Sequence, residues 1–174
     1  HNQKDFYKIR KEKLFFRTLK KEFNIKNFGF SVYDKYLADR ILDEYPNSSI
    51  QFPYNIINKK FETLKKRQSV FFARSIFLQG LLISSKIKAI NKNLIRQHKR
   101  YIEFIKLYNL DPLKLSLDFV NNNSDIDFLI FGVKNKKQMR SIINYKPKRI
   151  DFKIIKKIQN FFKGKESDPR SWLS

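Results

Sequence analysis

The chain has 174 residues, a length that suits one domain or part of a larger one. Hydrophobic residues make up 41% of it and aromatic residues 16%, which argues against disorder and allows a packed core. The sequence contains no cysteine, so disulfides, thiolate metal sites and thiol nucleophiles are excluded. The apolar runs at 76–83 and 128–133 are too short to span a bilayer, and no secretory signal pattern opens the chain. We therefore expect a cytoplasmic protein that does not insert into membranes.

The net charge of +22 at pH 7 would suit nucleic acid or an anionic surface as a partner. The lysines, however, are scattered through every polar segment, where solvated helix faces are expected. The chain is also rich in Asn, Ile, Phe and Tyr, as is typical of an AT-rich genome. We therefore favour a compositional bias and do not expect nucleic acid as a partner. The charge should still attract anionic ligands, including phosphorylated cofactors.

The first 52 residues predict two or three helical segments and two strands. Apolar residues at helical spacing, with lysines between them, indicate one or two helical pieces over 5–23. A strand follows over 28–33, in which Gly29 suggests close packing of backbone or side chains. A short helix is predicted over 36–45, and a second strand over 49–52.

The stretch 69–82 holds the clearest strand, and it follows a helix that we expect over 59–67. β-branched and aromatic residues at Val70–Ala73 predict a buried strand, and a polar pair and then Gly80 come after it. Parallel α/β barrels build their sites from such polar strand ends. A core strand that runs into an ordinary turn explains this stretch equally well when it is taken alone.

In the second half, the apolar residues of 91–108 repeat with the period of a helix. Asp111 and Pro112 form an N-cap and a first-turn proline, which start another helix. The remaining predicted elements are a strand over 126–131, helices over 135–144 and 151–162, and a polar tail over 164–174. This alternation implies a parallel sheet. Because no G-x-G-x-x-G follows the first strand, it favours half of a (β/α)₈ barrel over a dinucleotide-binding Rossmann domain.

Several short motifs at the predicted strand ends resemble, in order and spacing, those of the aldo/keto reductases. They are Gly29–Tyr33, Gln51–Asn55 with Phe61, Ala73–Leu82, Phe131–Val133 with Gln138, the helical stretch 109–120, and His1-Asn2 at the end of the family's fourth strand. The resemblance implies an α/β fold that is a partial TIM barrel, roughly strands five to eight with their helices. The C-terminal part of the barrel would occupy 1–150, and a C-terminal helix and tail 151–174. Since the chain begins with His1 rather than Met, we expect the N-terminal half to be missing.

The family reduces carbonyls with NADPH or NADH and without a metal, so the resemblance implies NADP or NAD as the cofactor. His1 matches the catalytic histidine of the family, which orients the carbonyl and the acid tyrosine. An imidazole suits that role because it donates a hydrogen bond to an oxygen that gains negative charge. An arbitrary first residue is the plainer alternative. His98 lies on a helical stripe and is expected to be a packed or surface histidine, and no ligand cluster supports a metal site.

The positions that match the family's cofactor-binding residues are Ser31, Gln51, Arg74, Ser75, Phe77, Leu78, Gly80, Gly132, Val133 and Gln138. Ser31 and Gln51 would hold the nicotinamide carboxamide, because together they supply a donor and an acceptor. Solvated strand ends are the simpler explanation for both. Val32 stands where the family usually has Asn, which removes one carboxamide contact.

Arg74 occupies the position where many relatives place an aromatic ring against the nicotinamide. A planar guanidinium can also stack there, or it can pair with a carboxylate at the barrel mouth. The segment from Ser75 to Gly80 matches the part that contacts the pyrophosphate, and the glycine permits close approach. Gly132, Val133 and Gln138 match the adenosine end, although Ile142 replaces the Asn that relatives use to read adenine.

The resemblance implies an NAD(P)H-dependent carbonyl oxidoreductase that acts on a small-molecule aldehyde or ketone. The family's Asp, Tyr and Lys, which supply and tune the proton, would lie upstream of His1, so we expect these 174 residues alone to be inactive. The exposed sheet edges of half a barrel should also make the isolated piece aggregate or dimerise. Two alternatives stay open, namely a basic α/β module that binds nucleic acid or an anionic polymer, and a catalytically degenerate reductase.

Overall fold

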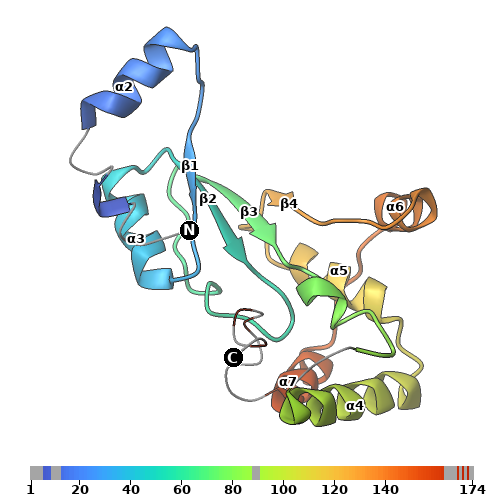
Figure 1. Ribbon diagram of the computed structural model, residues 1–174. Coiled ribbons are helices and arrows are strands. Elements are labelled where there is room, and N and C mark those ends of the chain that lie inside the picture. The colour runs from blue at the N-terminus through green and yellow to red at the C-terminus, as the bar shows by residue number, and fades with distance from the viewer. Residues whose placement is uncertain are drawn as a thin grey trace.

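The computed structural model describes residues 6–8, 13–87, 91–162, 168, 170 and 172. Within them, one parallel sheet has the strand order β1-β2-β3-β4, so neighbours in the sheet are also successive strands in the chain (Figure 1). The strands are β1 (Gly29–Ser31), β2 (Ser49–Pro53), β3 (Val70–Arg74) and β4 (Phe128–Leu129). Sequential order of parallel strands is the arrangement of an α/β barrel and not of a doubly wound sheet. The predicted partial barrel is therefore confirmed.

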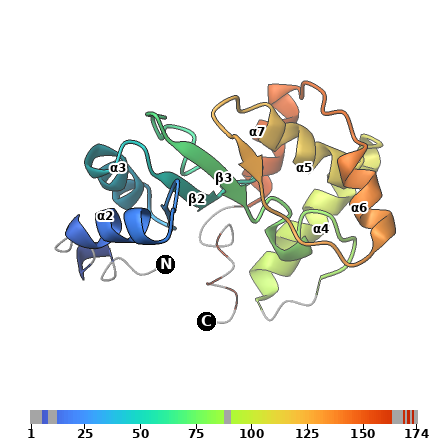
Figure 2. The same ribbon diagram turned by 90° about the horizontal axis from the view of Figure 1, so that it is seen from above.

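Helices flank the sheet at both ends of this strand order. They are α2 (Lys13–Glu22), α3 (Lys35–Glu44), α4 (Lys92–Leu107), α5 (Pro112–Asn121), α6 (Lys136–Ile143) and α7 (Phe152–Phe161), with a short 3₁₀ turn, η1 (Leu78–Gly80). In Figures 1 and 2, α2 and α3 lie beside β1, whereas α4 to α7 gather beyond β3 and β4. An Asp or Asn side chain caps each of α3 to α7 by accepting hydrogen bonds from first-turn backbone amides, which explains where these helices begin.

The two faces of the sheet have different environments. Ile50, Phe52, Phe71 and Ala73 alternate along β2 and β3 on the buried face, and each is at most 1% exposed. Burial of one such large side chain contributes about 1.5–3 kcal/mol relative to exposure. The intervening side chains of β2 and β3, except that of Pro53, are only half-buried. The core therefore lies between the sheet and the helices, and the opposite face remains open.

Gly29 brings β1 very close to β2. A Cβ added at Gly29 would lie 2.3 Å from the Ser49 carbonyl oxygen, a separation that backbone atoms cannot relieve without moving the strand. The pairing continues beyond β1, where the Val32 amide donates to the Gln51 carbonyl at 2.8 Å. The close packing expected at Gly29 is thus confirmed.

The helix expected over 59–67 is wrong, because this segment forms turns over 60–63 and has no regular secondary structure over 64–67. The Glu62 amide bonds to the Lys59 carbonyl and the Leu64 amide to that of Phe61, each three residues back and at 3.0 Å. Phe61 stacks on Phe52 with ring centroids 4.7 Å apart. A segment this short has little helical stability of its own, so the burial of its apolar side chains decides its conformation.

Other predicted bounds need smaller changes. The strands expected over 28–33 and 126–131 are shorter, at Gly29–Ser31 and Phe128–Leu129. The tail expected to be polar also makes an apolar contact, since Trp172 packs against the core. The helix expected over 151–162 is α7, which packs on α4 through Phe104 and Phe161 with ring centroids 5.5 Å apart. A domain boundary at residue 150 stays a prediction.

Candidate functional site

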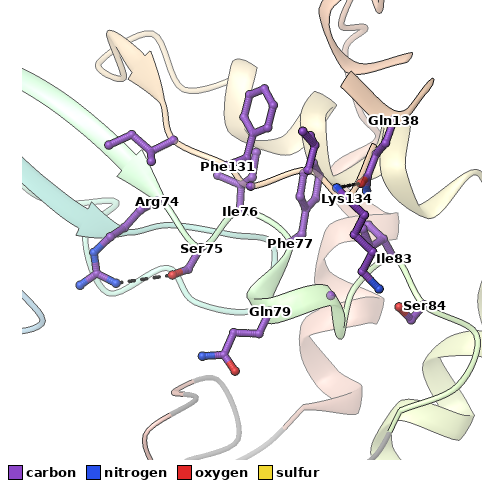
Figure 3. A pocket seen from close by; sticks show the side chains of 14 residues that line it. Arg74, Ser75, Ile76, Phe77, Gln79, Ile83, Ser84, Phe131, Lys134 and Gln138 are labelled. Atoms are coloured by element: carbon purple, nitrogen blue, oxygen red, sulfur yellow. Dashed lines mark hydrogen bonds between the residues drawn. The ribbon is translucent and has the colours of Figure 1, made fainter. Parts of the chain in front are cut away.

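A pocket of about 760 Å³ lies at the carboxyl ends of β3 and β4, beside the start of α6 (Figure 3). It is lined by Arg74–Phe77, Gln79, Gly80, Ile83, Ser84, Ile130–Lys134 and Gln138. Two of these described lining residues, Arg74 and Lys134, are cations, and none is a carboxylate. The carboxyl ends of parallel strands are where α/β folds bind ligands. The pocket therefore suits an anionic ligand.

The loop that follows β3 and lines the pocket has a strained backbone. Three residues other than glycine have left-handed φ values there, Ser75 at 57°, Leu78 at 46° and Gln79 at 53°, and Gly80 follows at 91°. Each left-handed residue that is not glycine costs about 1–2 kcal/mol. Such strain clusters at functional sites, where the surrounding structure holds it in place. Here the fully buried Leu78 side chain anchors the loop.

Helix α4 holds the far end of this loop. The His98 Nε2 lies 3.1 Å from the Leu81 carbonyl oxygen and 3.0 Å from that of Ser84, and the Tyr101 hydroxyl donates to the Leu82 carbonyl at 2.8 Å. Burial lowers the pKa of His98, although the two carbonyl contacts oppose it, so the imidazole is neutral at pH 7. Burial also raises the pKa of Tyr101. The helical stripe predicted a packed or surface histidine at His98, and the structure shows that it is packed. The stripe did not predict its attachment to the loop.

The opposite wall of the pocket is tied together by side-chain hydrogen bonds. The side-chain Oε1 of Gln138 accepts a hydrogen bond from the backbone amide of Lys134 at 2.8 Å. The backbone amide of Gln138 donates to the Asn135 Oδ1 at 2.9 Å. The second bond caps α6, whose N-terminal end carries partial positive charge. The Lys134 amide is therefore already engaged, which leaves its ammonium group to meet a ligand.

Ser31 and Gln51 lie on the open face of the sheet, in register on β1 and β2. The Ser31 hydroxyl donates to the Gln51 Oε1 at 3.0 Å. Both line a second hollow of about 290 Å³, which shares only Ile130 with the first pocket. The structure thus brings the predicted carboxamide pair together, next to the pocket rather than in it.

The Arg74 side chain points away from Lys134 in Figure 3 and lies at the carboxyl ends of the strands. Its guanidinium carbon is 4.1 Å from the centroid of the Tyr33 ring, and that of Arg170 is 3.8 Å from the same centroid. Two guanidinium groups this close to one centroid occupy opposite faces of the ring. Sequence reasoning missed Tyr33 and Arg170, since nothing in their spacing connects the tail to a strand end.

A scan against protein-family models finds no match, and a search of curated proteins finds none either. Among solved structures, the aldo-keto reductase AKR11C1 from Bacillus halodurans, in its holo form, matches with a TM-score of 0.65 at 16% identity, over 85% of this chain and 54% of that chain. The chain has the fold of part of an aldo-keto reductase. The glycerol dehydrogenase AKR11B4 from Gluconobacter oxydans also matches, with a TM-score of 0.56 at 13% identity, over 83% of this chain and 51% of that chain.

This chain spans about half the length of those aldo-keto reductases, 54% and 51%. At such low identity the match shows the fold, which confirms the resemblance found at the strand ends. Of the residues carried over from the aldo-keto reductase pattern, the first pocket collects Arg74, Ser75, Phe77, Gly80, Gly132, Val133 and Gln138. Their roles stay predictions.

Two of the remaining predicted residues differ from this group. The Leu78 side chain is fully buried, so only the backbone of this residue can contact a bound dinucleotide. His1 lies outside the described residues. In the part of the chain that the structure describes, no three His, Asp or Glu side chains are placed to hold a metal ion. None of the helices in those same ranges is long and apolar enough to cross a membrane.

Proposed function

We propose that this chain is the dinucleotide-binding part of an NAD(P)H-dependent carbonyl reductase, which converts an aldehyde or ketone to an alcohol. The observation that carries the proposal is the first pocket, where a strained loop, the cation Lys134 and the absence of carboxylates among the described lining residues coincide. Its volume of about 760 Å³ suits a ligand of cofactor size. The fold similarity to aldo-keto reductases supports the same conclusion.

Each part of the site would meet a different part of the cofactor. When bound, the nicotinamide would supply the hydride that attacks the carbonyl carbon. The Ser31 hydroxyl and the Gln51 amide would hold its carboxamide, since between them they donate and accept hydrogen bonds. The backbone of 75–80 would approach the pyrophosphate. Lys134 and the N-terminal end of α6 would hold the adenosine end through their positive charge.

Titration of the 174-residue chain with NADPH and NADH tests the proposal. Trp172, the single tryptophan, lines a hollow beside Gln79 and Gly80, so binding in the pocket should change its fluorescence. We expect saturable one-to-one binding that Lys134→Gln weakens several-fold. Lys106→Gln, which removes the same charge from an exposed position on α4, should leave the affinity unchanged. A larger loss for NADPH than for NADH would assign the 2′-phosphate to Lys134.

Binding measured over a series of salt concentrations distinguishes the proposed reductase from the rival function, a basic module that binds nucleic acid. Counterion release makes nucleic-acid binding fall steeply with salt. If DNA of arbitrary sequence bound with a steep salt slope while neither dinucleotide reached saturation, the reductase proposal would be wrong. Saturable dinucleotide binding that survives physiological salt would exclude the rival.

A further inference from the structure

Arg74 carries a charge that no described carboxylate neutralises. It is half-buried, and the other described arginine of that class, Arg40, has Glu44 at 3.8 Å. The Arg74 Nε is buried and has no hydrogen-bond partner among the described residues. Its terminal nitrogens reach only the Ser75 hydroxyl and the Val32 carbonyl, both at 3.4 Å. Contacts this long satisfy the terminal donors poorly, and an anion would satisfy them better.

The position of this cation follows from the strand register. Ser31, Gln51 and Phe72 form one row across β1, β2 and β3, and Arg74 lies in the next row toward the carboxyl end, beside Pro53. Two residues along a strand span about 6.6 Å. The contact with Tyr33, at 4.1 Å, keeps the guanidinium over the open end of the sheet.

From this arrangement we infer that Arg74 is a substrate-recognition residue, which binds the carboxylate or phosphate group of an anionic carbonyl compound. The inference rests on the proposed function, in which Ser31 and Gln51 hold the nicotinamide carboxamide one row below Arg74. It adds that the reacting carbonyl lies between that row and Arg74. Lys134 lies on the other side of the strained loop in Figure 3 and would serve the cofactor instead. The two lining cations of the pocket therefore recognise different anions.

The test measures binding of alcohol products, because aldehydes would condense with the many lysines. The probes are 4-hydroxybutanoate, glycerol 3-phosphate and the neutral butane-1,4-diol, each titrated by calorimetry into the chain with and without saturating NADP⁺. The variants are Arg74→Met and Arg74→Lys. The matched control is Arg100→Met, which also removes a guanidinium from an aromatic ring, that of Phe161 at 5.4 Å, but on α4 and outside the pocket.

We expect Arg74→Met to weaken at least one anionic probe tenfold or more, and Arg74→Lys to restore part of the affinity because the charge returns without the planar fork. Butane-1,4-diol and NADPH should bind all variants within about twofold of the unaltered chain. The tighter of the two anionic probes identifies the group as carboxylate or phosphate.

Equal losses in Arg74→Met and Arg100→Met would overturn the inference, since they would report net charge alone. Joint loss of NADPH and anion binding in Arg74→Met would also overturn it, by assigning the guanidinium to the cofactor. Failure of the unaltered chain to bind NADPH would instead refute the proposed function. The titrations without nucleotide would still decide whether Arg74 binds the anion.

Discussion

The left-handed backbone at Gly80 allows a sharp test of the strained loop. Its φ is 91°, and a Cβ added there would meet only the Ser84 hydroxyl at an ordinary 3.6 Å. Gly80→Ala therefore adds conformational strain without a clash. The strain costs about 1–2 kcal/mol, and the reduced entropy of the unfolded chain offsets about 0.4–1 kcal/mol of it. The net loss of about 1 kcal/mol should lower Tm by roughly 2–4 °C in a domain of this size.

Gly132→Ala is the matched control for Gly80→Ala. Gly132 lines the same pocket, but its φ lies outside the left-handed range and an added Cβ would meet nothing within 4 Å. The entropy effect alone then applies, so Tm should stay the same or rise slightly. Thermal unfolding followed by far-UV circular dichroism compares the two variants with the unaltered chain. If Gly80→Ala melted at or above the temperature of Gly132→Ala, the assignment of strain to this loop would be refuted.

Three further predictions concern the sheet and the support of the loop. Gly29→Ala should lower Tm by several times as much as Gly80→Ala in the same melting experiment, because its Cβ would lie 2.3 Å from the Ser49 carbonyl oxygen. A decrease in Tm of less than about 2 °C would contradict the close packing of β1 on β2. Tyr101→Phe leaves the Leu82 carbonyl without its 2.8 Å donor, so urea unfolding should show a loss of about 1–3 kcal/mol, and an unchanged midpoint would exclude a role for this bond. Burial lowers the pKa of His98 in the folded chain, so its contribution to stability is complete above its unfolded pKa of about 6.5 and declines as the pH falls below that value. His98→Gln should therefore reduce the dependence of the unfolding free energy on pH between pH 7.5 and 5. A pH dependence equal to that of the unaltered chain would show that other groups cause it.

The sequence predicted most of the fold because its signals are local. The β-branched and aromatic residues Val70, Phe71 and Phe72 favour a strand, and the Asp111-Pro112 pair starts α5 through an N-cap that needs no distant partner. The strand-end motifs also located most of the pocket. The carboxyl ends of parallel strands meet at one edge of a sheet, so Ser75, Gly80 and Gly132 come together once the strands are parallel.

The remaining features depend on contacts between residues that are far apart in the chain. The helix expected over 59–67 does not form, and Phe61 of this segment stacks on Phe52, a contact that no local pattern contains. His98 bonds to carbonyl groups 14 and 17 residues away. Arg74 contacts the ring of Tyr33, and Arg170 from the tail contacts the same ring. By itself, then, the sequence determined the order of the elements and the strand ends that build the pocket, through short-range propensity and capping. Only the tertiary structure decided the strained φ values of Leu78 and Gln79 and the direction of the Arg74 guanidinium, because packing across the sheet supplies the energy that holds both in place.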